Sequence, residues 1–105
     1  MASKKIYLHL TVRVPHAQLH EFNEFWGKES LPRWLANGAR HIGSYVNYVG
    51  GVYGEIIRLF EFDSLSHFEK FQDSLTDSED GRSIIKKIDR FNVVVEQKLL
   101  RAIYE

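Results

Sequence analysis

The chain has 105 residues, 44% of them hydrophobic and 13% aromatic, with 14 basic residues balanced by 14 acidic ones and no cysteine. This length predicts a single domain over residues 1–105, and the balanced charge argues against a nucleic-acid partner. The lack of cysteine excludes disulfides and thiolate metal sites, and it fits a cytoplasmic protein. We expect neither a signal peptide nor a membrane span, because no apolar stretch approaches the ~20 residues that cross a bilayer.

The first predicted element is a β-strand over residues 6–14. Five aliphatic residues alternate there with Tyr7, His9, Thr11 and Arg13. A period of two predicts a strand with one apolar and one polar face. Pro15 ends it, because proline has no N–H for the sheet.

A helix is predicted over residues 17–36. Leu19, Phe22, Phe25 and Trp26 recur at steps of three and four, which places them on one helical face. Pro32 interrupts this pattern, so we expect a kink or break near residue 31. The pair Asn37-Gly38 is typical of a helix end.

Two further strands, over residues 40–49 and 55–62, flank the glycine-rich segment 50–54. Glycine adopts the positive φ angles of a hairpin turn without steric cost. A phosphate-binding loop would be followed by a helix, whereas Ile56-Ile57 and Leu59-Phe60 favour a strand. The glycines therefore predict a hairpin.

The second half of the chain predicts a short helix over residues 65–75, a polar loop over 76–81, a helical segment over 84–91 and a last strand over 93–104. The order β-α-β-β-α-(α)-β is that of a ferredoxin-like α+β sandwich with a four-stranded antiparallel sheet. Helices would cover one face of this sheet. Its other face carries aromatic and aliphatic residues, so we expect two sheets to pair face to face in a homodimer, and higher oligomers stay open.

The chain resembles a NIPSNAP-type member of the dimeric α/β-barrel superfamily. The resemblance is carried by four segments: IYLHLTVRVP, WGKESLPRWLANGARHIGSY, VGGVYGEIIRLFEFDSL and the closing strand. It implies the ferredoxin-like fold and a dimer that closes an α/β barrel. Superfamily relatives include cofactor-free monooxygenases, haem-degrading enzymes and isomerases. Their ligands lie between the sheet and the helices or inside the barrel.

The candidate site residues follow from the faces expected for the strands. If the aliphatic face of the first strand meets the helices, then His9 faces the barrel, and we place Ile56, Arg58, Phe60 and Phe62 there too. In the strand over residues 40–49, we expect His41, Gly43, Tyr45 and Asn47 to face the barrel. We predict His9 as a general base and Arg58 as the group that holds an anion or a developing oxyanion. The predicted substrate-binding residues are Tyr7, Arg13, Trp34, His41, Tyr45, Asn47 and Phe60. The alternative is that these residues only satisfy one another structurally.

Neither a metal nor another cofactor is predicted. His16 and His20 lie four residues apart on the first helix, but no third ligand accompanies them. Two hypotheses for the function remain. One is a cofactor-independent monooxygenase or isomerase that acts on a small aromatic or polyketide-like molecule. The other is a non-catalytic dimeric module that binds a ligand or a protein.

Overall fold

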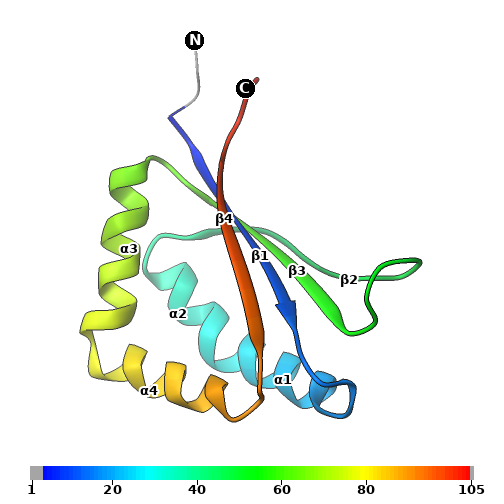
Figure 1. Cartoon of the computed structure of the whole chain (residues 1–105). Helices are drawn as coiled ribbons and strands as arrows, with labels where there is room; N and C mark the ends of the chain where they lie inside the picture. Colours follow the sequence, from blue (N-terminus) through cyan, green and yellow to red (C-terminus); the bar gives the residue numbers. More distant parts are fainter. Residues whose placement is uncertain (1–3, 105) are drawn as a thin grey trace.

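The computed structural model describes residues 4–104 and contains one four-stranded sheet. The elements, in chain order, are β1 (Ile6–Arg13), the 3₁₀ turn η1 (His16–Gln18), α1 (Leu19–Phe25), the π-helical turn η2 (Trp26–Ser30), α2 (Leu31–Ala36), β2 (Arg40–Val46), β3 (Glu55–Phe62), α3 (Leu65–Asp77), α4 (Glu79–Asp89) and β4 (Val94–Arg101). Figure 1 shows their arrangement. The strand order is β2-β3-β1-β4, and every neighbouring pair is antiparallel. This is the predicted ferredoxin-like topology.

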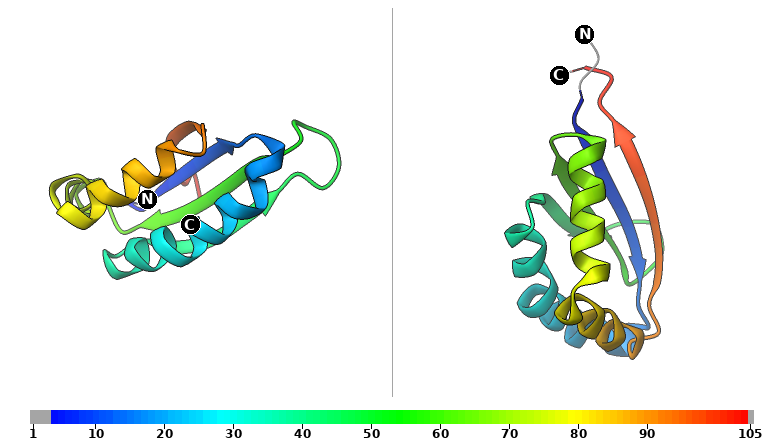
Figure 2. Two further views of the ribbon diagram at one scale, coloured as in Figure 1. Left: turned by 90° about the horizontal axis from the view of Figure 1, so that it is seen from below. Right: turned by 90° about the vertical axis from the view of Figure 1, so that its left-hand side faces the viewer.

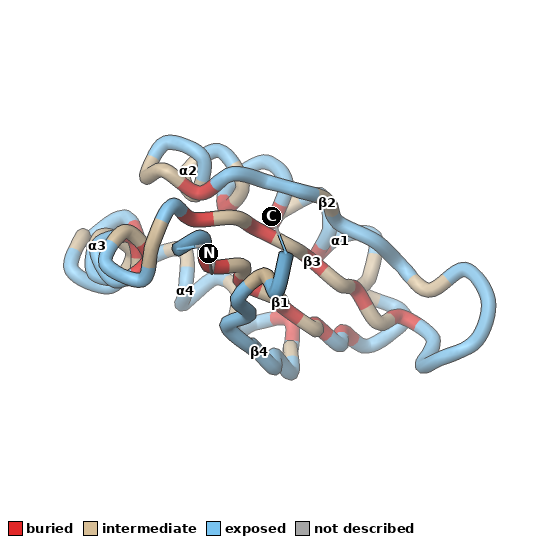
Figure 3. The backbone as a smooth tube through the Cα atoms, turned by 90° about the horizontal axis from the view of Figure 1, so that it is seen from above, coloured by how far each residue is buried: buried red, intermediate tan, exposed pale blue. Residues whose placement is uncertain are grey.

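The helices form one layer against one face of the sheet, as the right-hand view of Figure 2 shows. The aliphatic side chains of β1 at positions 6, 8, 10 and 12 are buried on that face, as predicted. Those at positions 8, 10 and 12 join a core that includes Phe22 from α1 and both Phe68 and Phe71 from α3. In Figure 3 buried positions alternate along β1 and β3, whereas β4 is exposed throughout. Within residues 4–104, the opposite face of the sheet has no helix over it, and we call it the open face.

The faces predicted for β3 were wrong. In the register of β1 with β3, Arg58 lies opposite Leu10, and Phe60 lies opposite Leu8. The buried side chains of β3, which face the helices, are therefore Ile56, Arg58, Phe60 and Phe62. Apolar residues occur in both alternating sets of positions of this strand, so alternation alone could not decide which set faces the helices. The large rings fill the core, and the other phase carries two carboxylates to the open face.

The faces predicted for β2 were wrong in part, because the strand contains a bulge. The register shifts between His41 and Gly43, so that His41 lies opposite Phe60 and Ser44 lies opposite Arg58. His41 is thus on the helix face, while Gly43 and Tyr45 remain on the open face, opposite residues 59 and 57. An extra residue in one strand reverses the alternation beyond it, which the sequence did not reveal.

The long first helix is interrupted where a break was predicted. The five-residue π turn η2 separates α1 from α2, and Pro32 follows as the second residue of α2. Proline cannot donate the usual N–H to the carbonyl four residues earlier, and a wider turn accommodates this missing bond. The break begins at Trp26, which becomes important for the site.

The connection between α3 and α4 is shorter than predicted. Residues 76–81 were expected to form a loop, but Ser78 alone separates the two helices. Its hydroxyl accepts a hydrogen bond from the backbone N–H of Gly81 at 3.0 Å and so caps α4. A Cβ at Gly81 would come within 1.9 Å of the Leu75 carbonyl oxygen, so only glycine allows the two helices to approach this closely.

The glycine-rich segment connects two strands, as predicted. Gly50, Gly51 and Gly54 all have positive φ angles between β2 and β3. Figure 1 shows this loop extending from the end of the sheet, away from the helices. Within residues 4–104, none of the helices combines the length and the hydropathy needed to cross a bilayer.

Candidate functional site

A cavity of about 300 Å³ lies between the first helical segment and the strands β2 and β3. Its lining residues are Asn23, Trp26, Gly27, Leu31, His41, Ser44, Tyr45, Val46, Ile56 and Arg58. The wall is mostly apolar, with a few convergent polar groups, which is the composition of a small-molecule site.

A larger groove, of about 500 Å³, lies between α2 and α4. Its charged side chains are already paired with each other. Arg33 lies 3.9 Å from Asp80, and Lys87 lies 4.0 Å from Glu29. Arg33 also donates a hydrogen bond to the hydroxyl of Ser78. This groove therefore offers less unpaired charge to a ligand than the smaller cavity.

Arg58 is the chemical centre of the smaller cavity. Its side chain is only 5% exposed, yet among residues 4–104 no carboxylate lies within ion-pair distance of it. Its Nη1 donates to the Ser44 hydroxyl at 2.9 Å, and its Nη2 donates to Asn23 Oδ1 at 3.3 Å. The guanidinium carbon lies 3.8 Å from the ring centroid of Trp26, a cation–π contact. Within residues 4–104, the side chains that contact this buried cation are thus all neutral.

Burial lowers the pKa of Arg58 to about 10. The guanidinium is still cationic at neutral pH, because neutral pH lies well below this pKa. Its Nε is buried and has no hydrogen-bond partner in the described part of the chain. A buried charge without a counter-ion is costly, and an anion bound beside it would offset that cost.

His41 and Ser44 extend the polar part of the cavity. His41 Nε2 lies 2.8 Å from the Ser44 hydroxyl oxygen, which is the same atom that accepts the hydrogen bond from Arg58. The His41 ring lies beside Phe60, with the ring centroids 5.1 Å apart. The three polar residues therefore form one continuous chain of hydrogen bonds along the cavity.

Two local irregularities build this arrangement. The bulge in β2 places both His41 and Ser44 on the helix face, although residues three apart in a regular strand face opposite sides. The π turn η2 opens beside them and contributes Trp26 and Gly27 to the lining. Bulges and π turns are frequent next to functional sites because they re-aim side chains.

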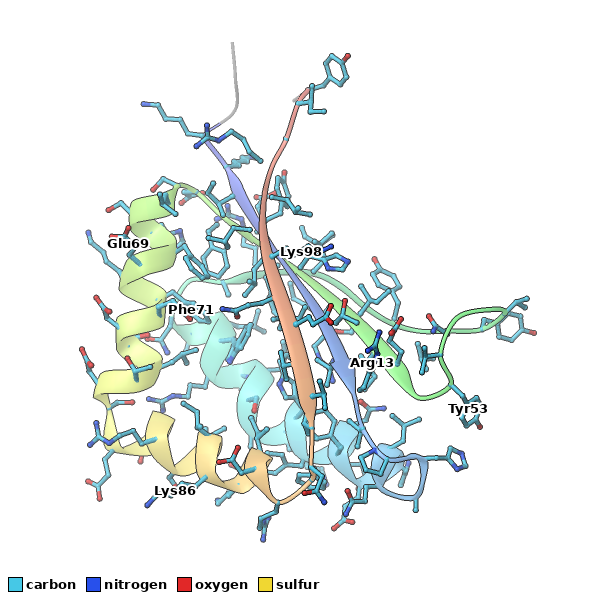
Figure 4. All side chains as sticks on the ribbon, in the orientation of Figure 1. Arg13, Tyr53, Glu69, Phe71, Lys86 and Lys98 are labelled. Carbon is cyan, nitrogen blue, oxygen red and sulfur yellow. The ribbon has the colours of Figure 1, made fainter. Side chains whose placement is uncertain are left out.

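The predicted catalytic pair is not brought together within the chain. His9 lies on the open face, opposite Leu59 and Lys98, whereas Arg58 points to the helices from the other side of the sheet. Figure 4 shows Lys98 on β4, on the strand next to β1. A sheet separates the two side chains, so they do not share a cavity.

Tyr7 and Arg13 also lie on the open face, where each of them interacts with a carboxylate. Arg13 Nε donates to Glu55 Oε2 at 2.9 Å. A hydrogen bond to Glu61 raises the pKa of Tyr7 above its ordinary value. Neither residue lines the cavity.

The structure places the other predicted substrate-binding residues in different parts of the molecule. His41 lines the cavity from the helix face, and Tyr45 is also among the lining residues although its position opposite Ile57 lies on the open face. Phe60 is fully buried, and Trp34 packs on it with ring centroids 4.7 Å apart, so both belong to the core and not to the lining. Asn47 donates to the Val52 carbonyl at 2.8 Å and holds the hairpin loop together.

Sequence reasoning missed three polar or aromatic members of the site. Asn23 and Trp26 lie three residues apart on the first helix, a spacing that puts them on one face. The interpretation of Trp26 as a core residue is confirmed, but its second role in the cavity lining was not predicted. Ser44 was missed because the bulge is invisible in the sequence. The one feature of the sequence that indicated this site was Arg58, an arginine in an otherwise apolar strand.

The histidines of the first helical segment do not form a metal site. His16 Nε2 lies 3.1 Å from the Tyr53 hydroxyl, and His20 pairs with Glu24 at 3.4 Å. Figure 4 shows Tyr53 in the loop between β2 and β3. Across residues 4–104, no group of three or more His, Asp or Glu side chains is placed to hold a metal ion.

The NIPSNAP family model matches residues 10–102, nearly the whole chain. The chain belongs to the NIPSNAP family. A comparison with curated protein sequences finds no match.

Solved NIPSNAP structures share the fold at low sequence identity. A NIPSNAP family protein from Agrobacterium tumefaciens superposes with a TM-score of 0.83 at 16% identity, over 95% of this chain and 87% of that protein. An uncharacterised NIPSNAP domain protein from Burkholderia xenovorans gives a TM-score of 0.82 at 18% identity, over 95% of this chain and 97% of its own.

The fold extends beyond the family. SnoaB, a cofactor-independent oxygenase from Streptomyces nogalater, superposes with a TM-score of 0.71 at 8% identity, over 98% of this NIPSNAP chain and 97% of SnoaB. At such identity the likeness concerns the fold and not the activity.

Proposed function

We propose that this NIPSNAP protein binds a small organic molecule in the cavity between sheet and helices, with an anionic or strongly polarised oxygen of the ligand on Arg58. The observation that carries the proposal is the buried guanidinium without a carboxylate partner among residues 4–104. An anionic ligand would supply the missing counter-charge, and charge-assisted hydrogen bonds are the strong ones.

The rest of the lining supports a ligand with a flat apolar body. Trp26, Leu31, Val46 and Ile56 provide aromatic and aliphatic surface around the polar chain. Such a wall favours an aromatic or polyketide-like carbon skeleton over a sugar or a nucleotide, because hydroxyl-rich ligands need many more polar partners.

The reaction class we propose is that of a cofactor-independent monooxygenase or an isomerase. The cavity combines a cation that can stabilise a developing oxyanion with the imidazole of His41 as a group for proton transfer. That SnoaB, which has the same fold, is a cofactor-independent oxygenase supports this class.

We also propose a homodimer, formed through the open face of the sheet. Apolar side chains on that face remain accessible in the single chain, with Tyr45 55% and Leu100 42% exposed. Pairing two such faces would remove this surface from water.

The open face equally supports the second candidate function, a non-catalytic dimeric module that binds a ligand or a protein. The lack of cysteine supports a reducing, cytoplasmic location for either.

Titration with aromatic carboxylates tests the ligand proposal. Benzoylformate serves as the probe, and binding is followed by tryptophan fluorescence, to which Trp26 in the cavity lining contributes. We expect saturable binding to the wild-type protein and a loss of affinity of at least about tenfold in Arg58→Met, because a charge-assisted hydrogen bond contributes roughly 1.5–3 kcal/mol.

The matched control is Arg13→Met, which removes an arginine from the open face and leaves the cavity intact. It should bind the probe with wild-type affinity. Equal affinities of the Arg58 and Arg13 variants, or no saturable binding by the wild-type protein, would refute the proposed function.

A further inference from the structure

The bulge in β2 creates a pair of side chains whose chemistry is not needed for binding alone. His41 and Ser44 are three residues apart and would face opposite sides of a regular strand. The register shift brings both to the cavity, with His41 Nε2 at 2.8 Å from the Ser44 oxygen.

The contacts of Ser44 determine where its proton points. A serine hydroxyl has one hydrogen and two acceptor lone pairs. One lone pair accepts the hydrogen bond from Arg58 Nη1 at 2.9 Å. The hydroxyl hydrogen is then available for His41 Nε2, in the tautomer that carries the ring proton on Nδ1.

His41 is also connected to solvent. Its side chain is exposed, whereas Arg58 at the other end of the hydrogen-bonded chain is buried. A proton that reaches the imidazole can therefore exchange with water, while the guanidinium stays in a less polar environment where it stabilises negative charge more strongly.

We propose that Ser44 and His41 act as a proton-transfer pair, and that the ligands of the cavity are enolisable carbonyl acids whose carbonyl oxygen lies on Arg58. This inference rests on the proposed function, since it needs a ligand in that cavity, and it adds the substrate class and the step.

The step is an enolisation. The Ser44 oxygen takes a proton from the carbon next to the carbonyl group, while the hydroxyl proton passes to His41 Nε2. The electron pair of the broken C–H bond forms a C=C bond, and the carbonyl pair moves onto oxygen, where the charge of Arg58 stabilises the enolate. Return of the proton from His41 through Ser44, to carbon or to oxygen, completes a tautomerisation without an oxidant or a reductant.

Deuterium exchange tests this step directly. Phenylpyruvate has exchangeable hydrogens beside its ketone, whereas benzoylformate is a 2-oxo acid without them, so the two probes separate proton transfer from binding. In D₂O, we expect the wild-type protein to accelerate the loss of the phenylpyruvate methylene signal in the ¹H NMR spectrum by about a hundredfold or more over buffer.

Variants of the pair sharpen the test. His41→Gln keeps a hydrogen-bonding side chain but has no basic nitrogen, so the exchange rate at saturating phenylpyruvate should fall at least about tenfold while the benzoylformate dissociation constant changes by less than about threefold. Ser44→Ala should lose exchange, and Ser44→Thr, which keeps the hydroxyl, should retain most of it. His20→Gln on the outer side of α1 is the control and should behave as wild type.

Two outcomes would overturn the inference and leave the proposed function intact. One is a wild-type protein that binds benzoylformate but exchanges phenylpyruvate no faster than buffer does. The other is an unchanged exchange rate in His41→Gln. Failure of the wild-type protein to bind benzoylformate would overturn both proposals together.

Discussion

The arginines on the two faces of the sheet have different kinds of partner. On the open face each strand arginine has a carboxylate partner: Arg13 lies 2.9 Å from Glu55, and Arg40 lies 2.8 Å from Glu61 and 2.7 Å from Asp63. On the helix face Arg58 has only a serine, an amide and an indole ring.

We interpret this difference as one between arginines that serve the fold and an arginine that we propose binds a ligand. Exposed ion pairs contribute little to stability, and they leave no charge unused. A buried arginine without a counter-ion is destabilising by itself, so it is expected where an anion will complete the arrangement. We derive four predictions from this comparison, beginning with the largest effect on stability.

Removing a core ring from β3 should have the largest effect. Phe60 is fully buried and contacts the rings of Trp26, Trp34 and His41. Phe60→Ala should lower the free energy of unfolding by about 3–5 kcal/mol, measured by urea denaturation. The neighbouring Leu59→Ala, on the open face, should cost roughly 1 kcal/mol at protein concentrations where the chain is monomeric. Equal costs for the two variants would contradict the register described for β3.

Replacing the unpaired cation should not destabilise the protein. Arg58→Met fills a similar volume and removes a buried charge, so the free energy of unfolding without ligand should stay level or rise by about 1 kcal/mol. Arg13→Met, which breaks an exposed ion pair, should lower it by less than about 1 kcal/mol. A loss of several kcal/mol in Arg58→Met would assign this arginine a structural role.

A charge on the open face should weaken self-association. Ile57→Lys places an ammonium group in the middle of the surface that we propose to pair, and the dimer dissociation constant should rise at least about tenfold, because an unpaired charge is costly to bury. Sedimentation velocity measures it. Glu69→Lys on α3, which Figure 4 shows projecting away from the sheet, is the control. A monomeric wild-type protein at all concentrations would refute the dimer.

The smallest effect concerns acid stability. The hydrogen bond from Arg40 lowers the pKa of Asp63. Burial alone would raise the pKa of Glu61, but hydrogen bonds from Arg40 and Tyr7 outweigh it and lower that pKa too. A carboxyl whose pKa is lowered in the folded state stabilises the protein at pH values above its ordinary pKa, which is 3.8 for Asp63 and 4.5 for Glu61. This stabilisation is lost as the pH falls through the pKa of the folded state.

Arg40→Met should therefore lower the urea midpoint slightly at pH 7, and the difference from wild type should vanish in acid, below the ordinary carboxyl values. Arg90→Met is the control, since Arg90 donates to the Lys87 backbone carbonyl and forms no ion pair with another residue in the range 4–104. A difference between Arg40→Met and wild type that persists at low pH would show that these carboxyls are not its cause.

The site could be predicted only in part. An arginine in an apolar strand stood out because a charge is rarely placed there without a purpose, and His41 and Tyr45 were among the expected ligand-binding residues. The partner assigned to Arg58 was wrong, because His9 lies on the other face of the sheet. Asn23 and Ser44 were not predicted, since their roles depend on neighbours that are distant in sequence.

The sequence by itself determined the order of strands and helices and the break in the first helix, and through them the ferredoxin-like topology. These features depend on local patterns: alternation in β1, the missing N–H of Pro32 and glycines that adopt positive φ angles. Only the tertiary structure decided which phase of β3 meets the helices and where β2 bulges. Both alternating sets of positions in β3 contain apolar residues, so the choice depends on how large rings from separate elements fill one core, and no local stretch of the chain determines that packing.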